Sequence, residues 1–340
     1  MKLDLHHGRV EMNHGSGGRA MAQLIDGLFA RQFANDYLAQ GNDGAVLPAP
    51  AGRLVISTDS HVVSPLFFPG GDIGSLSVHG TVNDVVVMGA RPLYLAASFI
   101  LEEGFPLADL RRIVESMACA AVEAGVSIVT GDTKVVEKGK GDGVFITTTG
   151  VGVVRDGIVL SGNLARPGDK VLLSGCIGEH GMAILSQREG LSFDTSIVSD
   201  SAPLNGLVEA MLDTGVQLRA LRDPTRGGLA TTLNELAKQS SVGMRLEEEA
   251  IPVSPTVAAA CEFLGLDPCY IANEGKLVAI CAPHDADRLL AAMQGHPLGQ
   301  RAAIIGEVVE DCHGFVQMTT RLGGRRILDW LSGEPLPRIC

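Results

Sequence analysis

The sequence lacks the long apolar runs that membrane proteins need. No stretch approaches the roughly 18 apolar residues of a membrane-spanning helix. The start of the chain, Met1 to Val10, holds no apolar segment long enough for a secretory signal peptide. We therefore expect no membrane association and a cytoplasmic protein.

Clustered positive charge is also missing. The chain has 27 Lys and Arg against 39 Asp and Glu, which gives a formal net charge of -12. Nucleic-acid binding needs Lys and Arg gathered into patches that neutralise phosphates, and the sequence never assembles one. We therefore expect no nucleic-acid partner, although small anions can still bind at local sites.

The sequence has neither paired cysteines nor a familiar nucleotide-binding loop. Its seven cysteines are scattered and form no C-x-x-C pair, which excludes a complete disulfide framework and disfavours a zinc ribbon. The glycine-rich segment 13–18 is not followed by Gly-Lys-Ser/Thr and does not contain G-x-G-x-x-G. It is therefore neither a P-loop nor a Rossmann fingerprint.

What is present fits a globular protein of two domains. The chain has 340 residues, of which 46% are hydrophobic and 19% are charged, enough apolar material for two packed cores. Turn residues gather at Arg166-Pro167-Gly168-Asp169, so we predict one domain at 1–160 and another at 161–330. Residues 331–340 include Pro335 and Pro337 and almost no core material, which predicts an exposed tail.

Hydrophobic periodicity predicts helices and strands that interleave in both halves, which is an α+β fold. In the first half we predict helices at 19–34, 73–88 and 107–124, and strands at 45–47, 54–57, 92–101, 127–130 and 144–154. In the second half we predict strands at 170–173, 276–281 and 303–309, and helices at 180–189, 229–239 and 285–294. Gly89 stands where a left-handed cap would end the second helix.

Four aspartates of the first half stand beside glycines or at the ends of predicted elements: Asp43, Asp59, Asp84 and Asp132. Their hard oxygen ligands suit Mg²⁺, which usually arrives with nucleotide phosphates. Each aspartate alone is better explained as a cap or turn residue. Only the set of four predicts a metal site, in which all four would ligate Mg²⁺.

Two segments offer groups for binding an anion. Gly15, Ser16, Gly17 and Gly18 precede the first predicted helix, where backbone N–H groups can face a phosphate. A generic glycine-rich entry loop remains the alternative. The run from Asp223 to Leu229 opens a helix and offers Arg226 beside two glycines, although it also reads as a simple N-cap followed by proline.

Taken together, seven motifs resemble the HypE family of hydrogenase maturation factors. They are Asn13-His-Gly-Ser-Gly-Gly, Ser57-Thr-Asp-Ser, Asn83-Asp84, Gly131-Asp-Thr-Lys-Val, Asp223-Pro-Thr-Arg-Gly-Gly-Leu, Ala272-Asn-Glu-Gly-Lys and Pro337-Arg-Ile-Cys340. The resemblance runs from about residue 12 to the end. Aminoimidazole ribonucleotide synthetase, selenophosphate synthetase and thiamine monophosphate kinase share the internal aspartate motifs, and the Pro-Arg-Ile-Cys terminus separates HypE from them.

The resemblance implies two mixed α/β-sandwich domains of the aminoimidazole ribonucleotide synthetase type with a flexible C-terminal tail. It implies a homodimer joined through the first domains, with ATP and Mg²⁺ held mainly there. The implied nucleotide-binding residues are Gly15, Ser16, Gly17, Gly18, Asp43, Asp59, Asn83, Asp84, Gly131, Asp132, Asp223 and Arg226. One departure is Asn42, because relatives often have Asp-Asp where this chain has Asn42-Asp43.

The resemblance also implies a reaction on Cys340. A partner carbamoyltransferase, HypF, would place a carbamoyl group on this cysteine, and ATP-dependent loss of water would turn that group into a thiocyanate. The cyano group would then pass to iron on a complex of HypC and HypD for nickel-iron hydrogenase. The Cys340 thiol must ionise to accept the carbamoyl group, which Arg338 favours and the terminal carboxylate opposes.

Dehydration needs ATP and a base. An amide oxygen is a poor leaving group until it is phosphorylated, and the nitrogen must then shed protons. Family position nominates Glu274 as the base, with Lys134 and His79 for proton transfer or charge stabilisation. The alternatives are an exposed turn residue, a solvated charge and a satisfied core histidine. Two other functions remain open: a small-molecule kinase of the same superfamily, and a thiol carrier without enzymatic activity.

Overall fold

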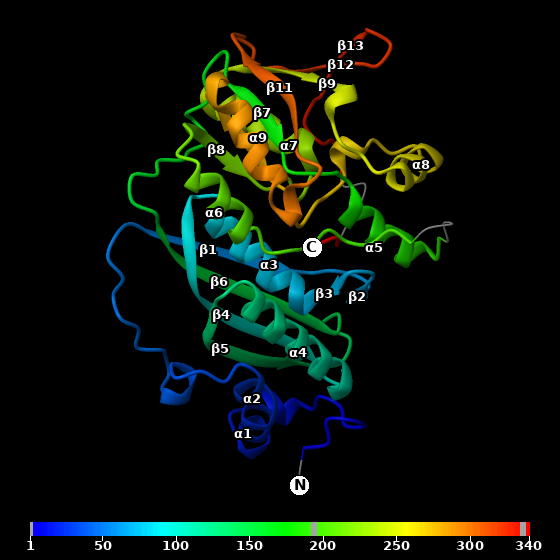
Figure 1. Cartoon of the computed structure of the whole chain (residues 1–340). Helices are drawn as coiled ribbons and strands as arrows, with labels where there is room; N and C mark the ends of the chain where they lie inside the picture. Colours follow the sequence, from blue (N-terminus) through cyan, green and yellow to red (C-terminus); the bar gives the residue numbers. More distant parts are fainter. Residues whose placement is uncertain (1–2, 192–195, 334–337) are drawn as a thin grey trace.

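The computed structural model of the chain describes residues 3–191, 196–333 and 338–340. Two sheets, each covered by helices, form two domains stacked one above the other (Figure 1). The predicted α+β architecture of two domains is therefore confirmed. The last strand of the first sheet ends at Val154 and the first strand of the second begins at Lys170. The predicted boundary between residues 160 and 161 falls in this connection.

The first sheet has four strands in the order β1-β6-β4-β5, and only the β4–β5 pair is parallel. The strands are β1 (Leu54–His61), β4 (Ala90–Glu102), β5 (Ser127–Val136) and β6 (Val144–Val154). Helices α3 (Ile73–Val86) and α4 (Leu107–Glu123) cover one face, and a short hairpin of β2 (Phe67–Phe68) and β3 (Gly71–Asp72) leads into α3. On the opposite face, Leu54, Ile56 and Ile100 are 54%, 68% and 41% exposed.

Helix α3 begins and ends on local signals. The Asp72 side chain accepts hydrogen bonds from the backbone N–H groups of Gly74 and Ser75, at 2.7 and 3.2 Å. These bonds satisfy donors that the first turn leaves unpaired. Beyond the last turn, Gly89 adopts a φ of 72°, which confirms the predicted left-handed cap. Because α3 lies between the first sheet and the second domain, nearly all of it is buried.

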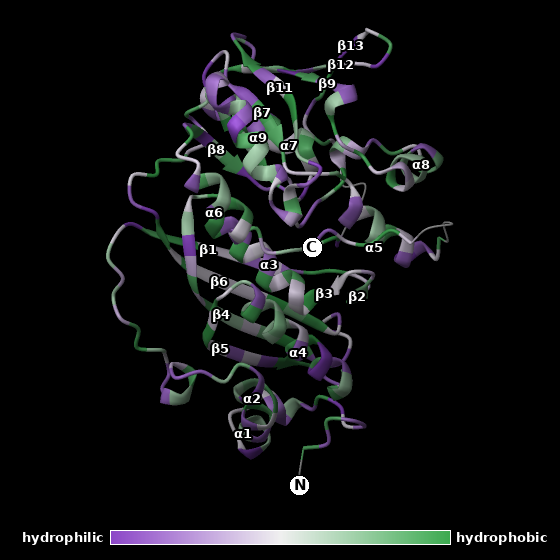
Figure 2. Cartoon of the chain, viewed as in Figure 1, coloured by the Kyte–Doolittle hydropathy of each residue, from purple (hydrophilic) through white to green (hydrophobic). Residues whose placement is uncertain are grey.

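The second sheet has seven strands in the order β13-β12-β9-β11-β7-β10-β8. They are β7 (Lys170–Leu173), β8 (Leu218–Arg222), β9 (Gly243–Glu247), β10 (Val278–Cys281), β11 (Ala303–Val309), β12 (Val316–Thr319) and β13 (Arg325–Ile327). The helices of this half are α5 (Glu179–Glu189), α6 (Asn205–Asp213), α7 (Gly228–Ser240), α8 (Pro255–Leu264) and α9 (Ala286–Gln294). Apolar residues recur along the strands of both sheets (Figure 2).

The predicted first helix is interrupted. It consists of α1 (Arg19–Leu24), a π-helical segment (Ile25–Phe29) and α2 (Ala30–Gln32), which together lie below the β5 edge of the first sheet (Figure 1). The ring of Phe29 lies 4.8 Å from the ring of Phe99 on β4. This aromatic contact anchors the N-terminal segment to the first domain.

Two strand predictions in the first half were wrong. Residues 45–47 form no strand, because they have no pairing partner and Val46 is 73% exposed. Strand β5 continues to Val136, so Gly131 and Asp132 lie inside the strand and not beyond its end. The cause is β4, whose pairing with β5 extends to Glu102 opposite Val136. Among the described helices, none is long and apolar enough to cross a membrane.

Candidate active site

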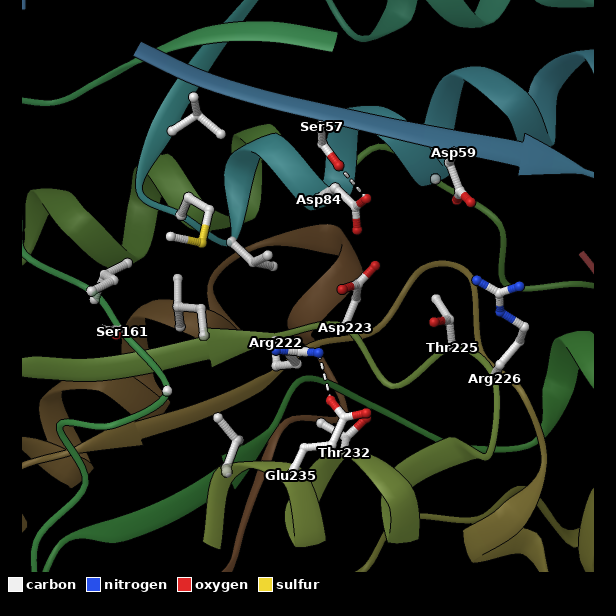
Figure 3. Close-up of a pocket in the computed structure, with 18 of the residues that line it drawn as sticks. Ser57, Asp59, Asp84, Ser161, Arg222, Asp223, Thr225, Arg226, Thr232 and Glu235 are labelled. Atoms are coloured by element: carbon white, nitrogen blue, oxygen red, sulfur yellow. Dashed lines mark hydrogen bonds and ion pairs between the residues drawn. The ribbon is translucent and has the colours of Figure 1, made fainter. Parts of the chain in front are cut away.

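A cavity of about 730 Å³ lies between the two domains. Strand β1 and helix α3 line it from the first domain, and β8 and α7 line it from the second. Figure 3 shows Asp59, Asp84 and Asp223 pointing into this space, with Arg226 beside Asp59. Residues from motifs in both halves of the chain therefore line this cavity.

Strand and helix periodicity explain why these side chains converge. Side chains alternate along a strand, so Ser57 and Asp59 of β1 face α3 while the residues between them face outward. Gly80 and Asp84 are four residues apart on α3 and share one face. The Ser57 hydroxyl donates a hydrogen bond of 2.6 Å to the Asp84 carboxylate, which fixes that side chain.

The acidic groups of the cavity disfavour one another's ionisation. Burial raises the pKa of Asp84, and the nearby charge of Asp59 raises it further. Burial, followed by the charge of Asp84, raises the pKa of Asp223 to about 7. A bound cation would relieve this repulsion, and carboxylate oxygens are the ligands that Mg²⁺ prefers. The donor chemistry of Asp59, Asp84 and Asp223 therefore suits Mg²⁺, although among the described residues these carboxylates are not gathered closely enough to hold an ion by themselves.

Glu274 is buried beside this cluster. Its side chain is 4% exposed, so the alternative of an exposed turn residue is wrong. Burial raises its pKa well above the usual value, and the charges of Asp223 and Asp200 act in the same direction. Its Oε1 has no hydrogen-bond partner among the residues that the structure describes. An unpaired buried carboxyl group with a raised pKa is typical of a catalytic acid or base.

Gly80 marks the point where the side chains of His61, Asp59 and Glu274 meet. A Cβ atom at this position would lie 3.1 Å from His61 Cε1, 3.5 Å from Asp59 Oδ2 and 3.9 Å from Glu274 Oε2. Sequence reasoning missed His61, although its place two residues after Asp59 on the same strand put both on one face. Burial lowers the pKa of His61, and neither ring nitrogen has a hydrogen-bond partner within the described part of the chain.

Cys340 lies in a smaller neighbouring cavity of about 260 Å³ that shares Arg226 with the first. A backbone oxygen of Cys340 accepts a 3.0 Å hydrogen bond from the backbone N–H of Val62, just beyond β1. The preceding residue, Ile339, is only 4% exposed. The predicted exposure of the tail is therefore wrong for this residue, because its apolar side chain is buried against the domains. The tail prolines, 335 and 337, lie outside the described residues.

The other predicted nucleotide residues lie elsewhere. Asp43, Gly131 and Asp132 line a separate cavity of about 670 Å³ beside the N-terminal helical segment. Lys134 Nζ lies 2.8 Å from Asp132 Oδ2, and the hydrogen bond from this ammonium lowers the pKa of Asp132. The glycine loop 15–18 lies at the same edge, since a Cβ at position 15 would come within 2.6 Å of the Val135 nitrogen.

Strand register gives the separation of the two groups. Asp59 of β1 pairs with Thr148 of β6, which pairs with Ala97 of β4, which pairs with Gly131 of β5. Three strand spacings amount to about 14 Å. Asp132 follows Gly131, so its side chain points to the opposite face from that of Asp59. The two groups therefore occupy opposite edges and opposite faces of one sheet.

This separation affects two predictions about a single chain. Asp43, Asp59, Asp84 and Asp132 do not converge on one ion within a single chain. Across residues 3–191, 196–333 and 338–340, no group of three or more His, Cys, Asp or Glu side chains is arranged to hold a metal. Lys134 likewise lies at the far edge of the sheet from Glu274. In the sequence all these motifs looked equivalent, and only the strand order separates them.

His79 and Asn83 make contacts with the second domain. Neither is among the described residues that line the cavity. The Asn83 amide donates to the carbonyls of Ala202 and Glu274, at 3.0 and 3.1 Å, and accepts from the backbone N–H of Leu204. His79 Nδ1 lies 3.0 Å from the Ser201 hydroxyl, and burial lowers the pKa of His79 to about 4. Both residues hold the polypeptide around Glu274 in place.

Comparisons with known proteins agree with this arrangement. Residues 41–154 match the N-terminal domain, and residues 166–319 the C-terminal domain, of the AIR synthase related proteins. Carbamoyl dehydratase HypE of Cupriavidus necator is 71% identical over 339 residues, which cover 99% of this chain and 97% of that protein.

Solved structures extend the agreement to the fold. A crystal structure of hydrogenase maturation protein HypE in complex with ATP matches with a TM-score of 0.94 at 52% identity, covering 97% of this chain and 99% of that one. A crystal structure of the HypE–HypF complex matches with a TM-score of 0.80 at 52% identity, covering 91% and 99%. The chain belongs to the HypE family of the AIR synthase related proteins.

Proposed function

We propose that this chain is an ATP-dependent carbamoyl dehydratase that converts an S-carbamoyl group on its own Cys340 to an S-cyanate. The observation that carries the proposal is the docking of Cys340 in a cavity that shares Arg226 with the acidic cavity. A thiol-bound substrate would there lie beside groups suited to phosphate and proton chemistry. ATP binding is supported by the relative whose structure contains ATP.

The reaction balances in two steps. The carbamoyl oxygen attacks the γ-phosphorus of ATP, and the nitrogen loses one proton, which gives an S-bound imidate phosphate and ADP. Cleavage of the C–O bond, with loss of the second proton from nitrogen, then releases phosphate and leaves S–C≡N. Mg²⁺, when held by Asp59, Asp84 and Asp223, supplies neutralisation of phosphate charge.

Glu274 is the base in this proposal. Its raised pKa makes it a stronger base than an exposed glutamate once it is ionised. A cation at the neighbouring aspartates would favour that ionised form. Arg226, which lines both cavities, provides fixed positive charge where phosphate leaves the tail.

A homodimer would bring the separated residues together. The outer face of the first sheet exposes Leu54, Ile56 and Ile100, and such an apolar face favours burial against a second copy. Asp43, Asp132, Lys134 and the glycine loop stand at the edge opposite the acidic cavity. Two copies paired through this face would let the loop and Lys134 of one chain complete the site of the other.

The family supplies the proposed partners. HypF would load the carbamoyl group, in keeping with the relative solved as a HypE–HypF complex. The HypC–HypD complex would receive the cyano group for the iron of nickel-iron hydrogenase. The cysteines form no disulfide among the described residues, which supports a reducing, cytoplasmic location.

Intact-protein mass spectrometry tests the proposal. The chain and its Cys340→Ala variant are incubated with HypF, carbamoyl phosphate, Mg²⁺ and ATP. We expect a carbamoyl adduct on the wild type that loses the mass of water only with ATP, and no adduct on the variant. Consumption of ATP without an adduct, with HypF shown active on another acceptor, would instead support a small-molecule kinase of the same superfamily.

A further inference from the structure

We propose that His180 is a positioning residue for the reaction, because its ring nitrogen holds the Ile339 carbonyl and thereby sets the place of the Cys340 thiol. The inference rests on the dehydratase function proposed above. It concerns α5 of the second domain, which none of the sequence motifs includes. In Figure 1 the C-terminus lies between the two sheets, close to the start of α5.

The last three residues are held through their backbone. The Arg338 carbonyl accepts from Ser64 N–H at 3.2 Å and from Arg188 Nη2 at 2.9 Å. The Ile339 carbonyl lies 2.8 Å from His180 Nε2, and a backbone oxygen of Cys340 accepts from Val62 N–H. Backbone contacts of this kind fix where the chain ends without depending on the side chains they carry.

His180 is built for this contact. A carbonyl oxygen only accepts hydrogen bonds, so Nε2 must carry the proton and donate. In the neutral ring Nδ1 is then an acceptor, and the Ser199 hydroxyl lies 2.8 Å from it. Burial lowers the pKa of His180, which favours this neutral form. The ring of Phe68 stands edge-on at 5.5 Å and closes the other side.

The segment that holds His180 also holds the proposed base. We call residues 199–204 the strap. Asp200 accepts from the backbone N–H groups of Glu274 and Gly275, each at 3.2 Å, and its carboxylate pairs with Lys276 at 3.1 Å. Ser199, the adjacent residue, orients His180. The strap therefore contacts both the histidine that holds the tail and the backbone of the proposed base.

Arg188 also holds the tail, and we call His180 and Arg188 together the clamp. Its Nη2 donates to the carbonyls of Ser64 and Arg338, at 2.7 and 2.9 Å, and so bridges the tail to the chain beyond β1. Arg188 is two turns along α5 from His180. Both residues of the clamp thus come from one helix, and both bind backbone oxygens.

The test compares His180→Phe, which keeps a ring against Phe68 but has no donor, with His180→Gln, which restores an N–H near the position of Nε2. Ser186→Ala is the matched control, since among the described residues its hydroxyl bonds only the Met182 carbonyl within α5. Arg188→Met probes the other residue of the clamp should His180→Phe fold poorly. Each protein is alkylated with iodoacetamide, and the C-terminal peptide is followed by mass spectrometry, with exposed Cys119 and Cys312 as internal references. Loss of water from carbamoylated protein is then timed at saturating ATP.

We expect His180→Phe to raise the rate of Cys340 alkylation and to slow dehydration, each roughly ten-fold, since a buried carbonyl loses its donor. His180→Gln should stay within about three-fold of wild type, and Ser186→Ala should match it. Arg188→Met should raise the alkylation rate of Cys340 without changing that of Cys119. Equal rates for His180→Phe and wild type, or equal losses in the Phe and Gln variants, would overturn the proposal. If wild type forms no cyanate at all, the dehydratase function fails, while alkylation still decides the clamp.

Discussion

The two acidic groups at opposite edges of the first sheet have opposite electrostatics. Asp84, Asp223 and Glu274 lie between the domains, where burial and mutual repulsion raise their pKa values. Asp132 lies on the open face of β5, where Lys134 lowers its pKa. The carboxylates of the first group lack ion-pair partners among the described residues, whereas Asp132 in the second group is already paired with Lys134.

Under the proposed function, the first group would carry out the reaction and the second would complete the site from a second chain. Buried carboxylates without nearby cations destabilise the folded chain. Such groups are therefore typical of functional sites, where a bound cation or a transferred proton neutralises their charge. An exposed ion pair such as Asp132–Lys134 contributes little to stability and is easily re-paired. Asp132 and Lys134 can therefore exchange their partners for groups of another chain, which agrees with a site shared between two chains.

The largest expected effect is that of Glu274→Gln. The amide keeps the shape of the side chain but cannot accept the proton, so dehydration should slow by about 100-fold or more. ATP binding should persist, because Asp59 and Asp84 remain. Single-turnover mass spectrometry of carbamoylated protein measures the rate, with Glu123→Gln, exposed at the end of α4, as control. Dehydration at the wild-type rate would remove Glu274 from the mechanism.

Mixing variants of the two groups tests whether one site spans two chains. Asp59→Ala and Asp132→Ala should each abolish metal-dependent ATP hydrolysis. In a mixture refolded at equal concentration, half of the dimers are mixed and carry one intact site, so about a quarter of wild-type activity should return. Refolding each variant alone is the control. If both groups act within one chain, the mixture stays inactive.

Removing one acidic group from the cavity should change how stability depends on pH. The pKa of Asp223 is raised to about 7, so the folded state holds its proton more tightly than the unfolded chain does. Its contribution to stability is complete below pH of about 4 and is lost as pH rises towards 7. Without divalent cations, Asp223→Asn should raise the free energy of unfolding at pH 8 relative to pH 4.5 by roughly 1–3 kcal/mol.

Asp132, at the β5 edge of the first sheet, serves as a control because its contribution to stability should change with pH in the opposite direction. The pKa of Asp132 is lowered, so its stabilisation is present above the usual carboxyl pKa and is lost as pH falls through the lowered value. Asp132→Asn should therefore flatten the acid side of the stability curve and leave the change between pH 6 and 8 untouched. Denaturant unfolding followed by circular dichroism measures both curves. Identical profiles for the two variants would erase the contrast between the groups.

The smallest effect is expected at the exposed pair. Lys134→Met removes a partner that is 61% exposed, so the free energy of unfolding should change by less than about 1 kcal/mol. If Lys134 completes the site of a second chain, ATP hydrolysis should fall by far more than this change in stability accounts for. Thermal unfolding and ATPase rates on the same sample separate the two. A proportional loss of both would assign Lys134 a structural role alone.

The sequence predicted the elements better than their ends. Apolar periodicity located α3, α4 and most strands of both sheets, because burial on one face is written into residue order. It failed at β5, where pairing with β4 carries a strand through Gly131 and Asp132. It also failed for Val46, whose apolar neighbours find no partner strand. Pairing partners are distant in sequence, so local patterns cannot place a strand end.

For the site, the motifs named most of the groups but not their grouping. Asp59, Asp84, Asp223 and Glu274 were chosen from the sequence. The fold brings the three aspartates to one cavity and buries Glu274 beside it. His61, Asp200 and His180 gave no motif and emerged only from contacts across the two domains. Asn83 was chosen as a ligand residue, and its amide instead binds backbone.

By itself the sequence determined which chemical groups are present: acidic motifs, a glycine-rich loop and a terminal cysteine, in a pattern that resembles one family. The tertiary structure alone decided which of these groups meet. Strand order places Asp59 and Asp132 at opposite edges of one sheet. The register of the strand pairs, with side chains alternating between faces, places them on opposite faces. Both depend on hydrogen bonds between segments far apart in the chain, and residue order does not encode them locally.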